Sequence, residues 1–241
     1  MGRRAIVVQQ KQTRGPLTSG APRARGHHFF SSEYWDKLLG EIDLQSNLER
    51  AEISPSTESR MSVAAGLQQA LRLRQNDVVS ELKRGDSLEQ VLNRYLLAVE
   101  KMSDTEMFTS VLLVSSDGKR LSHGAAPSLP RPYREAIDGA EIGPVAGSCG
   151  TAAFLGRPVY VTDIATDPLW ANYRDVALPH GLRSCWSTPI RHADDHVMAT
   201  FAIYHRNMTS PTRDELNAIA IITDHVAQAI NWARNGELEQ I

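Results

Sequence analysis

Two pairs of β-rich runs, each joined by a short polar turn, constrain the fold more than any other feature of this sequence. The first pair lies in MFTSVLLVSSDGKRLSHGA (107–125), where a Ser-Asp-Gly turn separates the two runs. In the second pair, RSCWSTPI (183–190) and MATFAIYHR (198–206) flank the polar turn RHADDH (191–196). Turns this short join antiparallel strands, because a parallel crossover needs a dozen or more residues.

Capped helices bracket these strands. The RGD stretch at 84–86 interrupts a helical pattern, and Asp86 or Ser87 is placed to cap the helix that follows. After the last strand, Thr212 and Glu215 have the spacing of a capping box and open a helix with one apolar face. The helices therefore begin and end the strand-rich region.

The middle of the chain holds a further strand and a short helix. PVYVTDI (158–164) has the alternation of a strand, and Asp167-Pro168 combines a capping residue with proline at the first helical position. This order of elements predicts an α+β domain over residues 85–235, with an antiparallel sheet sandwiched by helices.

Other segments are predicted to lie outside this domain. Residues 1–30 hold six Lys and Arg with no acidic residue, which predicts a disordered basic tail. Residues 31–84 form a helical extension with a linker at SPSTES (54–59), and residues 236–241 form the C-terminal end. Near-heptad apolar positions mark the second part of the extension: Ala64, Leu67, Leu71, Val78 and Leu82.

Composition excludes several classes of protein. Hydrophobic residues make up 41% and charged residues 22%, as in an ordinary soluble protein, and no run approaches the roughly 20 apolar residues of a membrane span. A net charge of −2 supplies no field that would hold nucleic acid. Two cysteines, Cys149 and Cys185, are too few for a disulfide scaffold and fit a reducing cytosol. We predict a cytoplasmic protein with no membrane span and no nucleic-acid partner.

Three stretches carry a family resemblance. They are GSCGTAAFLGRPVYVTDIATDPLWANYRDVALPHGLRSCWSTPI (147–190), ATFAIYH (199–205) and SPTRDELNAIAIITDHVAQAI (210–230). In this order they resemble the GAF domain, a sensory and ligand-binding module, especially the GAF domains of bacterial sensor histidine kinases and cyclic-dinucleotide signalling enzymes. The resemblance implies a GAF-like antiparallel sheet between helices, with N- and C-terminal flanking helices.

The resemblance also implies a pocket for a small molecule beside the sheet. The residues it places at this pocket are Cys149, Gly150, Asp163, Trp170, Tyr173, Ser184, Trp186 and Thr188. Strand alternation puts the last three on one face of their strand and Cys185 with Ser187 on the other, so at most one set lines a given cavity. The aromatic members suit a pocket wall because they bury area and still offer a hydrogen-bond donor. The alternative is that they hold the short helix on the sheet.

Cys149 admits two interpretations. It lies where GSCGTAAFLG (147–156) starts a short helix, a position that lowers a thiol pKa, and it is also a small residue suited to a tight turn. Its Gly-x-Cys-Gly turn resembles free methionine sulfoxide reductase, a GAF-family enzyme. That enzyme has its catalytic cysteine in a loop that reads ATDPLWANYRD (165–175) here, without cysteine. We assign no catalytic residue, and a redox pair of Cys149 with Cys185 is the alternative.

Cofactors of the family leave no clear signature in this sequence. Asp214-Glu215 matches the acidic end of a cyclic-nucleotide set, but a first helical turn favours carboxylates in any case. His180 is the only histidine within the motif block where haem or a bilin would need a ligand. His123, His192, His196 and His205 form no metal-ligand pair with a nearby cysteine. We therefore predict no metal site and leave the cofactor unassigned.

These observations predict a non-catalytic sensory module. It would bind a small ligand of unknown identity and pass its state through the flanking helices, whose apolar stripes predict a homodimer. After Ile230 only NWARNGELEQI follows, too short for a kinase or cyclase, so we expect a stand-alone sensor acting on a separate signalling protein, or a piece of a longer one. A pocketless dimerisation scaffold is a third hypothesis.

Overall fold

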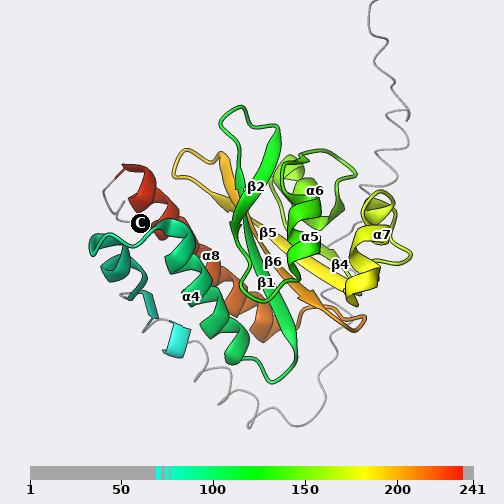
Figure 1. Cartoon of the computed structure of the whole chain (residues 1–241), viewed down its shortest axis with the longest axis horizontal. Helices are drawn as coiled ribbons and strands as arrows, with labels where there is room; N and C mark the ends of the chain where they lie inside the picture. Colours follow the sequence, from blue (N-terminus) through cyan, green and yellow to red (C-terminus); the bar gives the residue numbers. More distant parts are fainter. Residues whose placement is uncertain (1–68, 72–73, 76, 236–241) are drawn as a thin grey trace, which may run out of the picture. The chain divides into compact units, whose positions relative to one another are not determined.

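The computed structural model describes residues 69–71, 74–75 and 77–235 (Figure 1). The predicted basic tail (1–30), most of the predicted extension (31–68) and the end (236–241) lie outside the described residues. Where it is described, the segment 69–83 is helical, and the turn after it contains Gly85 at a φ of +97°. Glycine adopts this left-handed conformation without strain, so it ends the helix cleanly.

Helix α4 (Leu88–Lys101) begins with a capping box. The Ser87 hydroxyl accepts the Gln90 N–H, and the Gln90 side chain accepts the Ser87 N–H. Arg94 pairs with Glu81 before the turn and with Asp86 within it. Ser87 is therefore the capping residue, while the Asp86 carboxylate is engaged by Arg94.

The sheet is antiparallel throughout, in the order β3-β2-β1-β6-β5-β4. The pairs β1–β2 and β5–β6 are the two predicted hairpins, and β1 pairs with β6 in the middle of the sheet. The strands are β1 (Met107–Val114), β2 (Arg120–Ala125), β3 (Ala140–Glu141), β4 (Val159–Val161), β5 (Ser184–Arg191) and β6 (Val197–His205).

Helices cover both faces of this sheet, which confirms the predicted α+β class (Figure 1). One face carries α4, the segment 69–83 and α8 (Arg213–Asn235). The elements on the other face are α5 (Arg131–Ile137), α6 (Gly147–Leu155), α7 (Arg174–Ala177) and the 3₁₀ turns η1 (Pro168–Trp170) and η2 (Leu178–His180). Thr212 and Glu215 form the predicted box before α8, with the Thr212 N–H 2.7 Å from the Glu215 carboxylate.

Each face of the sheet has its own apolar core. Side chains alternate along β5 and β6, so Trp186 and Ile203 lie in the core under α4 and α8, whereas Cys185 and Tyr204 lie in the core under α6. The first core also buries the apolar stripe of the helical segment: Leu71, Val78 and Leu82. This apolar stripe therefore packs against other parts of the same chain.

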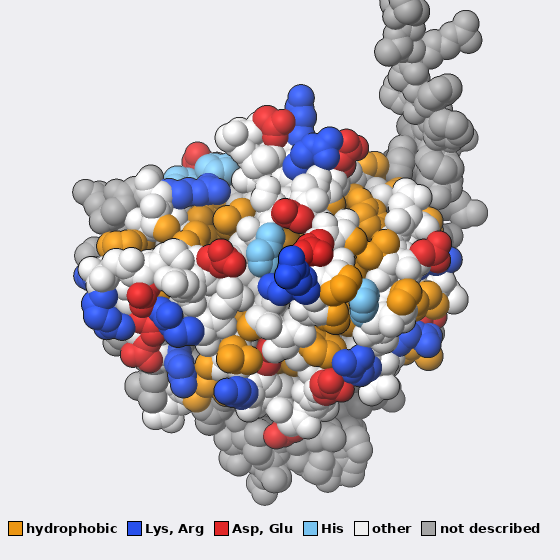
Figure 2. All heavy atoms as spheres, in the orientation of Figure 1, with side chains coloured by type: hydrophobic (Ala, Val, Ile, Leu, Met, Phe, Trp, Pro, Cys, Tyr) orange, Lys and Arg blue, Asp and Glu red, His pale blue; other side chains and the backbone are white. Residues whose placement is uncertain are grey.

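The surface view in Figure 2 shows acidic and basic side chains interspersed over one face of the molecule. This agrees with the near-neutral net charge of −2. Among the described residues, no helix has both the length and the apolar character that crossing a membrane would require.

Glu100, near the end of α4, ties this helix to the sheet. Its carboxylate accepts the N–H and the hydroxyl of Thr109 in β1, at 2.7 and 2.8 Å, and also the hydroxyl of Ser128. Thr109 is completely buried, so its N–H depends on this acceptor.

Substituting Glu100→Ala should lower the free energy of unfolding by about 2–3 kcal/mol, because buried donors lose a charged acceptor. Urea unfolding followed by circular dichroism measures the change. Glu135→Ala is the control, since this exposed carboxylate makes a surface pair with Arg131, and its loss should cost below ~0.5 kcal/mol. Equal effects of the two substitutions would contradict the role of Glu100.

Candidate functional site

Two glycines shape the start of α6. Gly147 has a φ of +61°, in the left-handed region. A Cβ at Gly150 would lie 2.5 Å from the Ala146 Cβ and 3.0 Å from the Glu141 carbonyl oxygen, closer than a side chain tolerates. Glycine at 150 therefore lets α6 lie close against residues 141–146.

Trp170 is fixed by a relay of hydrogen bonds. The Asp167 side chain accepts the Leu169 N–H at 2.8 Å and caps η1. The Trp170 indole N–H then donates to the Ser148 hydroxyl at 3.1 Å, and Ser148 donates to the Cys185 carbonyl at 2.9 Å. This relay connects η1 to α6 and α6 to β5.

A cavity of about 30 Å³ lies between α5, α6, the η1–α7 segment and the sheet. This volume accommodates roughly one or two water molecules. Its described lining contains no Asp, Glu, Lys, Arg or His and mixes aromatic, aliphatic and small polar residues: Leu112, Leu121, Tyr133, Ile137, Ala140, Ala146, Gly147, Ser148, Cys149, Gly150, Trp170, Tyr173 and Tyr204.

Comparison with known proteins identifies this architecture. The family model of the GAF domain matches residues 85–231. The chain belongs to the GAF domain family. A curated relative, the methyl sulfide methyltransferase-associated sensor of Methanosarcina acetivorans, is 36% identical over 202 residues, which cover 80% of this chain and 20% of that protein. The chain thus spans a fifth of the relative's length.

Solved structures share the GAF fold at low identity. The GAF domain of a phosphoenolpyruvate-protein phosphotransferase from Coxiella burnetii has a TM-score of 0.57 and 15% identity, covering 72% of this chain and 97% of that one. The free methionine-R-sulfoxide reductase of Neisseria meningitidis, in complex with its substrate, has a TM-score of 0.56 and 15% identity, covering 77% and 98%. At these identities the likeness shows the fold alone.

The cavity of this GAF domain brings together Cys149, Gly150, Trp170 and Tyr173, all of which the sequence placed at a pocket. Ligand contact by these four residues stays a prediction. The structure places the other predicted residues elsewhere.

Asp163 holds the turn after β4. Its carboxylate accepts the Ala165 N–H, the Thr166 hydroxyl and the Arg183 guanidinium. The hydrogen bond from Thr166 is the main cause that lowers the pKa of this carboxyl, and the pair with Arg183 adds to it. Asp163 therefore positions the segment that leads to Trp170 and is not part of the cavity wall.

Ser184, Trp186 and Thr188 point to the face of β5 that α4 and α8 cover. The Trp186 indole N–H donates to the Thr209 carbonyl at 3.0 Å, just before α8. Cys185 lies on the α6 side. Alternation separated the two sets correctly, but it could not assign their faces, because both faces of β5 are buried.

Sequence reasoning missed three polar residues of the cavity: Ser148, Tyr133 and Tyr204. The rings of Tyr133 and Tyr204 meet edge to face at 5.7 Å. Alternation in ATFAIYH could have put Tyr204 on the same face as Cys185. Tyr133 had no such signal, because the position of α5 over the sheet depends on tertiary packing.

Cys149 of α6 and Cys185 of β5 share the core on this face of the sheet, and both are buried free thiols. A hydrogen bond from the Cys185 thiol is the main cause that lowers the pKa of Cys149 to about 7. The Tyr204 hydroxyl, 3.8 Å from the Cys149 sulfur, adds to this effect. Burial raises the pKa of Cys185 well above its ordinary value. Of the two thiols, Cys149 is therefore the one that ionises first.

Titration of the thiolate absorbance should show a step with a midpoint near the Cys149 pKa of about 7. Cys185→Ala should move this midpoint upward, because the thiolate loses the donor that stabilises it. Cys149→Ala removes the step and serves as the control. A step that survives in Cys149→Ala, or one that Cys185→Ala leaves in place, would contradict the assignment.

Proposed function

We propose that this GAF domain is a non-catalytic sensory module that binds a small uncharged ligand in the cavity beside α6 and passes its occupancy to α4 and α8. The observation that carries the proposal is the cavity itself, walled by the segment that the family resemblance associates with ligands. Neutral hydroxyls, a thiol and an indole in an otherwise apolar wall suit a ligand without formal charge.

Ligand entry in this proposal requires the cavity to open. A volume of about 30 Å³ holds water but no metabolite. Trp170 and Tyr173 belong to the short η1–α7 segment, and the indole bond to Ser148 is one contact that holds this segment against α6. Breaking that bond and shifting the segment would enlarge the site.

Strand β5 is the proposed route from the cavity to the helices. On one side, the Cys185 carbonyl accepts the Ser148 hydroxyl. The next residue is Trp186, whose indole N–H donates a hydrogen bond to the Thr209 carbonyl before α8. The centroids of the Trp186 and His205 rings are 4.4 Å apart. A shift of α6 would therefore reach α8 through adjacent residues of one strand, as a packing change that ligand binding biases.

A redox role is the second candidate, favoured by the paired thiols. Cys149 and Cys185 could exchange two thiols for a disulfide, releasing two protons and two electrons to an oxidant such as a peroxide. Their burial and the absence of cysteine from residues 165–175 weigh against a reductase. The same free thiols fit the proposed cytoplasmic location.

Native mass spectrometry of the protein purified from its own host tests the sensory proposal. We expect wild type to carry an additional small mass, and Ala140→Leu to lose it, because the larger side chain fills the cavity. Ala171→Leu is the matched control, since it adds the same atoms on the exposed side of the η1–α7 segment. Cys185→Ser removes the thiol pair without changing a residue of the described cavity lining and should keep the ligand, whereas loss of the ligand would favour the redox role.

An empty wild-type spectrum, with no thermal shift across a library of neutral metabolites, would reject the sensory proposal. That outcome would favour a pocketless scaffold. Retention of the mass by Ala140→Leu would place the ligand outside this cavity.

We further propose that the domain forms a homodimer and acts on a separate signalling protein or a further output domain. The stripe of the segment 69–83 is buried within the chain, so the dimer contact is assigned to the outer side of α4, where Leu97 is 38% exposed. An adjacent copy would cover this apolar side chain.

Analytical ultracentrifugation should give twice the monomer mass of 26.6 kDa. Leu97→Glu should shift the protein to monomer, because a charge would be buried at the contact. Phe154→Glu is the control, since Phe154 is an exposed aromatic on α6, away from α4. A monomeric wild type, or a dimer unaffected by Leu97→Glu, would contradict this assignment.

A further inference from the structure

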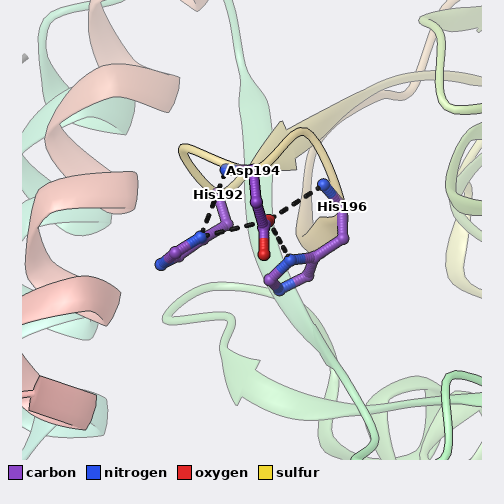
Figure 3. A group of neighbouring side chains, drawn as sticks. All are labelled: His192, Asp194 and His196. Atoms are coloured by element: carbon purple, nitrogen blue, oxygen red, sulfur yellow. Dashed lines mark hydrogen bonds and ion pairs between the residues drawn. The ribbon is translucent and has the colours of Figure 1, made fainter.

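The turn between β5 and β6 brings together three side chains that can ligate a metal (Figure 3). Ligand atoms of His192, Asp194 and His196 all lie within 4.8 Å of one another. They alternate along the turn with Ala193 and Asp195. The prediction of no metal site rested on the lack of a cysteine near these histidines, but the Asp194 carboxylate completes the group instead.

The hairpin holds the backbone that carries these side chains. The His192 N–H donates to the His196 carbonyl at 2.9 Å, and the Asp195 N–H donates to the His192 carbonyl at 2.9 Å. Asp195 takes a φ of +73°, which reverses the chain between the two histidines. Their rings stack with centroids 4.9 Å apart and planes 21° from parallel. The two imidazoles are therefore neighbours because of the turn itself.

The Asp194 carboxylate lies between the two imidazoles (Figure 3). One of its oxygens is 3.1 Å from the His192 Nδ1 and in closer contact with the His196 Nδ1. Arg191 pairs with the neighbouring Asp195 at 2.9 Å. Arg191 is thus engaged by a different carboxylate, and Asp194 faces the histidines.

We propose that His192, Asp194 and His196 bind a divalent transition-metal ion of the Zn²⁺ class. Two imidazole nitrogens and a carboxylate oxygen are ligands that Zn²⁺ accepts, at about 2.0–2.2 Å. Tetrahedral bonds of that length put ligand atoms about 3.4 Å apart. The His192–Asp194 separation of 3.1 Å is close to this value, and the exposed Asp194 side chain rotates to widen its contact with His196.

This site is separate from the cavity of the proposed function, because the described cavity lining includes no residue of the turn. Three protein ligands leave a coordination position for water, which distinguishes it from a closed structural zinc site. The bound ion would link the ends of β5 and β6 and stabilise the folded state.

Isothermal titration of the full chain with ZnCl₂, in a buffer that does not chelate the ion, tests the proposal. We expect one ion per chain at the turn. His192→Ala and His196→Ala should each weaken binding by ~10-fold or more, because even outer-shell partners of a metal contribute that much. With Co²⁺ in place of Zn²⁺, wild type should show the visible absorption of a site with low coordination number. Both variants should lose this absorption.

The control is His27→Ala/His28→Ala, which removes the chain's adjacent histidine pair and keeps the turn. This variant should retain the turn's binding step, and Zn²⁺ should raise the thermal midpoint of wild type but not of Asp194→Asn. Unchanged affinity in His192→Ala, or a binding step that only His27→Ala/His28→Ala removes, would overturn the proposal. Circular dichroism in the absence of metal verifies that each variant with a substitution in this turn is folded.

Discussion

Burial of β1, β5 and β6 on both faces is the constraint on which the rest of the structure depends. A strand that is apolar on both sides cannot leave either face to water, so helices must cover the sheet twice. α4 and α8 supply one layer, and α5 and α6 supply the other. Each face then has a core of its own, and neighbouring residues of a single strand belong to different cores.

Cys185 and Trp186 illustrate the consequence of this arrangement. Cys185 lies under α6, where its carbonyl accepts a hydrogen bond from the Ser148 hydroxyl. Trp186 lies under α8, where its indole N–H donates a hydrogen bond to the Thr209 carbonyl. One peptide bond therefore separates a residue on the cavity face of the sheet from a residue on the face that α4 and α8 cover. The proposed sensory function therefore needs no long pathway, because the strand that contacts α6 is also a strand that α8 packs against.

Local patterns predicted much of the fold and part of the site. Short polar turns determined the hairpins, and side-chain spacing determined the cap at Thr212 and limited the other cap to Asp86 or Ser87, because both depend on residues close in the sequence. The resemblance led to Trp170 and Cys149 at the cavity. Ser148 was not foreseen, because its partners in η1 and β5 are distant in sequence.

By itself, the sequence determined the antiparallel hairpins, the flanking helices and the GAF family, because turn length, capping and side-chain order are local properties. Only the tertiary structure decided which face of β5 meets the cavity, since two buried faces have the same apolar alternation. It also decided that the segment 69–83 packs into the core that α4 and α8 cover in the same chain. The convergence of His192, Asp194 and His196 likewise required the turn geometry, because spacing alone does not say where side chains point.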